Sequence, residues 1–187
     1  RQLLREGAVD VVLAYAVDRL SRNQNQIGIL LDDVEQAGGR LEFGIGRGFQ
    51  KAEYDAFERN MADSRALFEE AHDIIMKAWT EERFSYEGKF RQVRNLRVIP
   101  KPVQKLPPVY VACIFTPESF EWTAKQGYNL MVVPYAAPNP ESLIGNIQLF
   151  RDTRKTHGYT TAPEVLGVYH FYCGETTATA KEEPREA

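Results

Sequence analysis

Residues 38–50 read GGRLEFGIGRGFQ, and this stretch decides how the fold of the whole chain is interpreted. Apolar residues occupy every second position over 41–45, and a period of two is typical of a β-strand. Arg47 follows between Gly46 and Gly48. Glycines permit a tight turn and the close approach of a ligand, and the planar guanidinium of arginine suits phosphate. The stretch therefore predicts a strand that ends in an anion-binding loop, with a solvated arginine at a strand end as the alternative interpretation.

Strand and helix patterns alternate on both sides of this stretch. Upstream, a continuous apolar run over 9–15 and an amphipathic pattern over 23–37 lead into a strand over 40–45, which predicts a β-α-β unit. Downstream, an alternating pattern that turns at Glu87 and Gly88 predicts a β-hairpin over 84–98. The other predicted elements are strands over 109–114, 129–135 and 165–173, and helices over 64–79, 117–126 and 139–157. This alternation predicts an α/β fold with a parallel sheet.

The composition is that of an ordinary globular protein. Its 187 residues are 43 % apolar and 26 % charged, which is enough for one domain with a core. The net charge of −3 gives no indication of affinity for nucleic acid or anionic membranes, and no apolar run approaches membrane-spanning length. Cys113 and Cys173 lie far apart in apolar runs, which predicts buried thiols and neither a disulfide nor a metal site. We therefore expect a cytoplasmic protein without a metal and without a membrane or nucleic-acid partner.

The N-terminal stretch carries the pattern YxxDRLSR at residues 15–22. With the strand and helix patterns around it, residues 1–43 resemble the catalytic domain of serine recombinases, the resolvases and invertases. The resemblance implies that Arg19 and Arg22 position a scissile phosphate of DNA. Ser21 belongs to this pattern and is not the family's nucleophile, which lies in an Arg-x-Ser segment that does not precede the pattern in this sequence. A serine recombinase fragment (DNA strand exchange) lacking its nucleophile is therefore the alternative function.

From residue 38 onward a second resemblance takes over, carried by several blocks in order. The blocks are GGRLEFGIGRGFQKAEYDAF (38–57), FSYEGKF (84–90), IPKPVQ (99–104), PPVYVA (107–112) and TPES (116–119). Residues 38–187 resemble the bacterial luciferase-like flavin monooxygenases. The resemblance implies a partial (β/α)8 TIM barrel of the luciferase-like type, incomplete at both ends. We expect an arm at 1–37 packed on the barrel remnant, the partial barrel at 38–175 and a polar tail at 176–187, and the exposed sheet edge predicts self-association.

A second anion-binding element is expected where TPES opens a helix directly after a strand. Thr116 is the expected N-cap residue and Pro117 the first helical residue, and the amides at such a helix start favour an anion. The resemblance implies that this turn and the loop of Arg47 bind a flavin phosphate together. The implied cofactor-binding residues are Arg47, Gly46, Gly48, Thr116 and Ser119. A capping box of Thr116 and Ser119 without a ligand is the alternative.

The resemblance implies a flavin-dependent monooxygenase or oxidoreductase of the FMN type, which acts with dioxygen on a small organic substrate. Some relatives transfer hydride with a deazaflavin, so that cofactor stays open, and a truncated chain without activity is a further alternative. The bulky residues 113–115 stand where the family has small ones and are expected to crowd a flavin. His72 is interpreted as structural, His157 as a solvated residue at a helix end, and His170 as a residue that could face a ligand. No catalytic residue is assigned.

Overall fold

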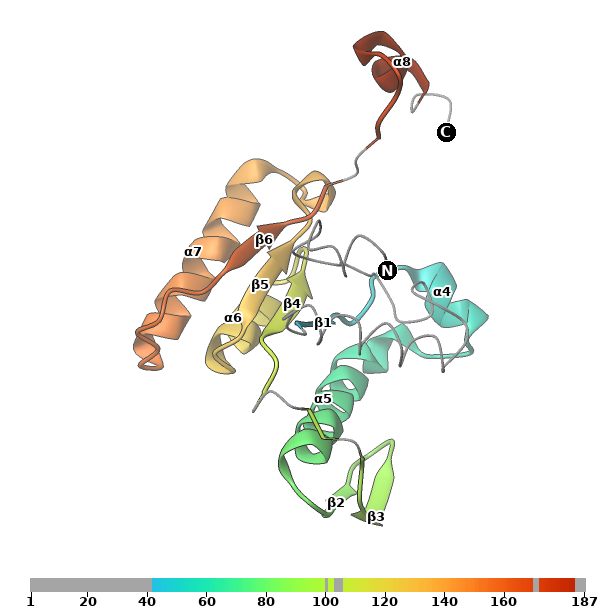
Figure 1. Cartoon of the computed structure of the whole chain (residues 1–187), viewed down its shortest axis with the longest axis vertical. Coiled ribbons are helices and arrows are strands. Elements are labelled where there is room, and N and C mark those ends of the chain that lie inside the picture. Colours follow the sequence, from blue (N-terminus) through green and yellow to red (C-terminus); the bar gives the residue numbers. More distant parts are fainter. Residues whose placement is uncertain (1–41, 100, 103–105, 170–171, 184–187) are drawn as a thin grey trace, which may run out of the picture. The chain divides into compact units, whose positions relative to one another are not determined.

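The computed structural model of the chain describes residues 42–99, 101–102, 106–169 and 172–183 (Figure 1). The predicted arm at 1–37 and His170 lie outside these residues. The described residues form two compact units. One unit holds those up to Phe43 and from Glu70 to Pro108, and the other holds those from Gly44 to Glu69 and from Val109 onward.

A four-stranded sheet with the order β1-β4-β5-β6 carries the structure of the larger unit. Its strands are β1 (Phe43–Ile45), β4 (Val109–Cys113), β5 (Asn129–Val132) and β6 (Val165–Gly167). β4, β5 and β6 run parallel, with Val111 opposite Leu130 and Leu130 opposite Val165. β4 has the continuous apolar sequence of a strand covered on both faces, and four of its five residues are buried. The predicted α/β fold with a parallel sheet is confirmed.

Two helices of the same unit build its core with the sheet. They are α6 (Pro117–Lys125) and α7 (Pro140–Thr156). The two helices pack against each other, and α6 also contacts β4 and β5 (Figure 1). Phe120 of α6, Leu130 of β5 and Phe150 of α7 are the largest side chains that are fully buried. Gly127 ends α6 at a φ of +74°, and the ring of Tyr159 lies where a Cβ at this position would be.

The smaller unit contains the predicted hairpin and the second half of a long helix. These elements are β2 (Phe84–Glu87), β3 (Gln92–Leu96) and α5 (Ser64–Thr80). Glu70 of α5 is buried, and its Oε2 accepts a hydrogen bond of 3.0 Å from the N–H of Phe90 beside the hairpin turn. A Cβ at Gly88 would lie 2.4 Å from the carboxyl carbon of Glu70, so a larger residue there would force this carboxylate to move. His72 is buried on the same helix with its Nδ1 3.1 Å from Asp73 Oδ1, as expected of a structural histidine.

Two strands are shorter than the sequence predicts. β5 ends at Val132 and not at 135, because Pro134 lacks an N–H for the ladder and opens a 3-10 turn, η2 (Pro134–Ala136). β6 ends at Gly167 and not at 173, because its parallel neighbour has already ended. An apolar run alone does not make a strand when no neighbouring strand continues beside it.

The remaining elements are short. They are the helix α4 (Lys51–Ala56), the 3-10 turn η1 (Met61–Asp63) and the helix α8 (Thr177–Glu182). α8 lies in the predicted polar tail and begins at a capping box, in which the side chains of Thr176 and Thr179 bond each other's backbone N–H. Part of the tail is therefore helical.

The two cysteines differ from each other in exposure. Cys113 at the end of β4 is buried as predicted, whereas Cys173 is exposed, which corrects the prediction for that residue. The early end of β6 accounts for the difference, since Cys173 lies beyond the sheet. The cytoplasmic location stays a prediction. Within the described ranges, no helix combines the length and the apolar character that crossing a membrane requires.

Candidate functional site

Arg47 leaves β1 through a two-glycine loop and directs its guanidinium at the start of α6. Nη2 donates hydrogen bonds of 3.4 Å to the hydroxyl oxygens of Thr116 and Ser119. Nη1 donates one of 3.5 Å to the hydroxyl of Ser64 at the start of α5. Gly48 has a φ of +76°, a left-handed conformation in which a side chain would be strained. The residues that the sequence singled out at two distant loops therefore meet around one guanidinium.

The hydroxyls at the start of α6 face the arginine and do not cap the helix. Thr116 occupies the N-cap position with an extended backbone, but its side chain makes no capping hydrogen bond. Its hydroxyl lies 2.8 Å from that of Ser119, whose N–H donates to the Thr116 carbonyl at 2.9 Å. The structure therefore shows no capping box at this helix start. Both hydroxyls can rotate, so each can donate a hydrogen bond to an anion that lies beside Arg47.

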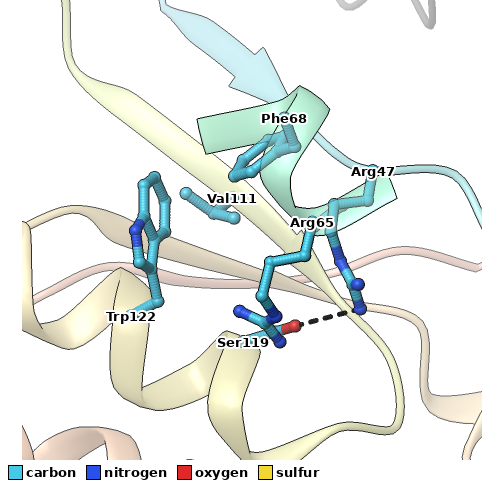
Figure 2. A pocket seen from close by; sticks show the side chains of 7 residues that line it. Arg47, Arg65, Phe68, Val111, Ser119 and Trp122 are labelled. Atoms are coloured by element: carbon cyan, nitrogen blue, oxygen red, sulfur yellow. Dashed lines mark hydrogen bonds between the residues drawn. The ribbon is translucent and has the colours of Figure 1, made fainter. Parts of the chain in front are cut away.

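A small pocket opens at this point, within the larger unit (Figure 2). Its lining residues are Arg47, Arg65, Phe68, Val111, Ala112, Ser119 and Trp122. Figure 2 shows the guanidinium of Arg65 extended toward Ser119, on the same side as that of Arg47. The rings of Phe68 and Trp122 meet edge to face, with their centroids 5.1 Å apart, and form an apolar wall. The pocket thus combines two guanidiniums and a hydroxyl with an aromatic side.

Arg65 is the residue that sequence reasoning missed. It is the second residue of α5, and it forms a long ion pair, 3.6 Å from Nη1 to Glu69 Oε1, with both side chains more than a third exposed. A cation in the first turn of a helix opposes the helix dipole, which favours negative charge at that end. This misplaced charge is the signal in the sequence that could have marked Arg65.

The residues that line the pocket carry a net positive charge. Among the lining residues there are two arginines and no carboxylate, and Glu118 is exposed outside the pocket. Burial raises the pKa of the neighbouring Cys113 thiol to about 11, while its hydrogen bond with Thr123 and the charges of Arg47 and Arg65 act in the opposite direction. The donor set therefore suits a phosphate-sized anion, which accepts several charge-assisted hydrogen bonds at once.

Other sequence candidates lie apart from the pocket lining. A Cβ at Gly46 would contact that of Ala112 at 3.2 Å, so a glycine keeps the loop close to β4. His157 is exposed at the end of α7, as predicted, with Nδ1 2.9 Å from the carbonyl of Thr153. Phe115 does not line the pocket but is 45 % exposed and meets Phe49 edge to face. In the described ranges, no group of three or more histidine, cysteine or acidic residues is placed to hold a metal ion.

The comparisons with known proteins identify a family. The family model for luciferase-like monooxygenases matches residues 31–187, so the match begins upstream of the boundary at residue 38 that the sequence predicts. It also includes the end of the stretch that resembles serine recombinases, and these findings give no support to the recombinase alternative.

Three relatives illustrate the match. The oxygenase component of the flavin-dependent trigonelline monooxygenase from Acinetobacter baylyi is 26% identical over 159 residues, which cover 80% of this chain and 42% of that protein. The monooxygenase RslO1 from Streptomyces bottropensis superposes with a TM-score of 0.70 at 31% identity, over 86% of this chain and 49% of its own. The oxygenating constituent of 3,6-diketocamphane monooxygenase from Pseudomonas putida, solved in complex with FMN, superposes with a TM-score of 0.63 over 86% of this chain and 47% of its own. At 19% identity, this last likeness shows the fold alone.

The chain spans less than half the length of each of these three relatives. The family model, in contrast, covers most of the chain, from residue 31 to its last residue. The chain therefore belongs to the luciferase-like monooxygenase family.

Proposed function

We propose that the chain is the flavin-binding part of a flavin-dependent monooxygenase, and that it holds the phosphate of FMN. The observation that carries the proposal is the meeting of Arg47 with Thr116 and Ser119, next to a second guanidinium from Arg65. The relatives support a flavin, since the trigonelline enzyme is described as flavin-dependent and the diketocamphane enzyme was solved with FMN.

The charge of the site suits a phosphate monoester. Such a group, as in FMN, carries about −1.5 to −2 charges at neutral pH. Two guanidiniums with no carboxylate among the lining residues match the charge of this group. Thr116, Ser119 and Arg65 would complete the set of donors around its oxygens, and Gly46 and Gly48 would let the loop approach it.

Bound reduced flavin would supply the reaction with dioxygen, and a small organic substrate would be oxygenated. The residues of this chain would orient the cofactor by its phosphate, because the loop after β1 and the starts of α5 and α6 bring the hydroxyls and guanidiniums together. The sheet is proposed to form part of a (β/α)8 barrel, with the loops of Arg47 and Thr116 on the face where barrels bind ligands.

Arg47→Ala tests the proposal. Charge-assisted hydrogen bonds contribute about 1.5–3 kcal/mol each, so the variant should bind FMN roughly 10- to 100-fold more weakly. Riboflavin lacks the phosphate, and its affinity should not change. The measurement is a titration of both ligands followed by flavin fluorescence, with Arg151→Ala as the control, because Arg151 is an exposed arginine of α7.

Two outcomes would contradict the proposal. Equal losses for FMN and riboflavin would show that Arg47 acts on the ring or on the fold. A wild-type chain that binds neither FMN nor inorganic phosphate would show that this half of the family fold does not form the cofactor site.

A further inference from the structure

Tyr54 of α4 reaches back to the loop that carries Arg47. Its hydroxyl donates a hydrogen bond to the main-chain carbonyl of Arg47 itself. The ring also lies beside Gly48: a Cβ added to this glycine would be 3.6 Å from the Tyr54 hydroxyl oxygen and 3.7 Å from a carbon of the ring. One aromatic side chain therefore contacts both the residue that bears the guanidinium and the left-handed glycine that follows it.

α4 is tied to the loop by its own backbone and side chains. The N–H groups of Glu53 and Tyr54 donate to the Gln50 carbonyl, and Arg59 N–H donates to the Tyr54 carbonyl at 2.8 Å. Lys51 and Asp55 form an ion pair across one turn of the helix, with a shortest distance of 2.6 Å. The position of Tyr54 is thus set by a short helix that begins at the end of the loop.

The hydrogen bonds of the Arg47 guanidinium are too long to hold this side chain firmly by themselves. Its three hydrogen bonds to residues that the structure describes are 3.4–3.5 Å long, at the upper limit for such bonds. A long arginine side chain loses up to about 2 kcal/mol of rotamer entropy when it is ordered, so weak side-chain contacts alone hold it poorly. Fixing the carbonyl and the φ and ψ angles at its base restricts where the guanidinium can go.

We propose that Tyr54 is a positioning residue for the anion site, which holds Arg47 so that its guanidinium meets the phosphate. The proposal rests on the proposed function, since it takes the pocket to bind a phosphate. Tyr54 acts through Arg47 and makes no contact with the anion. Tyr54 is not among the residues that line the pocket, which agrees with an indirect role.

The test is Tyr54→Phe, which removes the hydroxyl and keeps the ring. FMN affinity should fall about two- to tenfold, the factor expected for one lost hydrogen bond, while riboflavin affinity stays unchanged. Tyr169→Phe is the matched control, because Tyr169 is 68% exposed and lies beyond β6. A merely structural role of Tyr54 would weaken both ligands alike, and that result would overturn the proposal.

A double-mutant cycle with Arg47→Ala shows through which residue Tyr54 acts. In the Arg47→Ala background, Tyr54→Phe should cause no further loss of FMN affinity, because no guanidinium remains to be positioned. Independent, additive losses would overturn the proposal even if both single variants bind FMN weakly.

A measurement without ligand separates this proposal from the proposed function. In the NMR spectrum of the free chain, Tyr54→Phe should shift the Arg47 Nε–Hε signal and speed its exchange with water, whereas Tyr169→Phe should not. An unchanged signal overturns the positioning role. A shifted signal in a chain that binds no FMN supports the positioning of Arg47 and contradicts only the cofactor assignment.

Discussion

Arg65 places a positive charge in the first turn of α5, where the helix dipole makes it unfavourable by about 0.3–1 kcal/mol. The nearby guanidinium of Arg47 adds repulsion, and the pocket lining offers no carboxylate to offset it. A bound anion would remove both costs, because it neutralises the two arginines and accepts from the helix N–H groups. At the scale of single residues, an anion bound as proposed would therefore stabilise the start of α5 and the loop of Arg47.

The buried thiol of Cys113 predicts a loss of stability in alkaline solution. Burial raises its pKa from the ordinary 9.0 to about 11, so between these values the folded chain keeps a proton that the unfolded chain loses. The folded state then binds more protons, and the free energy of unfolding falls as pH rises through this window, by up to about 2–3 kcal/mol. Below pH 9 the contribution is fully present.

Urea denaturation of wild type and Cys113→Ala between pH 8 and pH 11 measures the effect. Other groups, including the half-buried Tyr86 with its raised pKa, titrate in both proteins, so the difference between the two curves isolates the thiol. Parallel curves would mean that Cys113 titrates normally.

At the scale of elements, replacing glycine by alanine should have opposite effects at two positions, because one glycine has free space beside it and the other is crowded. Gly145 lies inside α7 with nothing within 4 Å of its added Cβ, so Gly145→Ala should stabilise the protein by about 0.5–1 kcal/mol. Gly88→Ala should destabilise it by about 1–3 kcal/mol, because the carboxylate of Glu70 must move away from the N–H of Phe90.

Thermal denaturation of both variants checks this pair. Gly145→Ala serves as the control for the general effect of replacing glycine on the unfolded chain. If Gly88→Ala is as stable as the wild type, the contact between α5 and the hairpin turn is not needed for the fold.

The elements could be predicted from the sequence where local patterns set them, and the site only in part. α5 was predicted to end at 79 and ends at Thr80, since its apolar stripe and its length are local properties. β6 was predicted too long, because its end depends on β5, which lies more than thirty residues earlier. The resemblance identified Arg47 and Thr116, whereas nothing in the sequence analysis singled out Arg65. Only the folded chain brings it beside Ser119.

At the scale of the whole molecule, the exposed apolar side chains predict self-association. Phe57 is 77 % exposed, Tyr169 68 % and Ile144 66 %, and β1 and β6 occupy the outer positions of the described sheet. Unpaired strand edges and apolar surface promote association between chains. Sedimentation velocity should show a species larger than a monomer that grows with micromolar concentration.

A variant makes this prediction specific. Phe57→Ser together with Ile144→Ser should shift the sedimentation profile toward the monomer without changing the circular dichroism of the chain. A wild-type chain that sediments as a monomer throughout the concentration series would refute self-association.

The sequence contains two tryptophans, and the fold gives one to each compact unit. Trp79 meets Phe43 edge to face, with ring centroids 4.8 Å apart, and Trp122 lines the pocket of the larger unit. Each indole is therefore an intrinsic fluorescence probe of its own unit. In Trp79→Phe, the tryptophan emission comes from Trp122 in the pocket wall. Binding of a cofactor that absorbs this light would quench the emission by energy transfer. In Trp122→Phe, the emission of Trp79 reports the unfolding of the smaller unit, which contains the hairpin. The two units can therefore be followed separately without an attached dye.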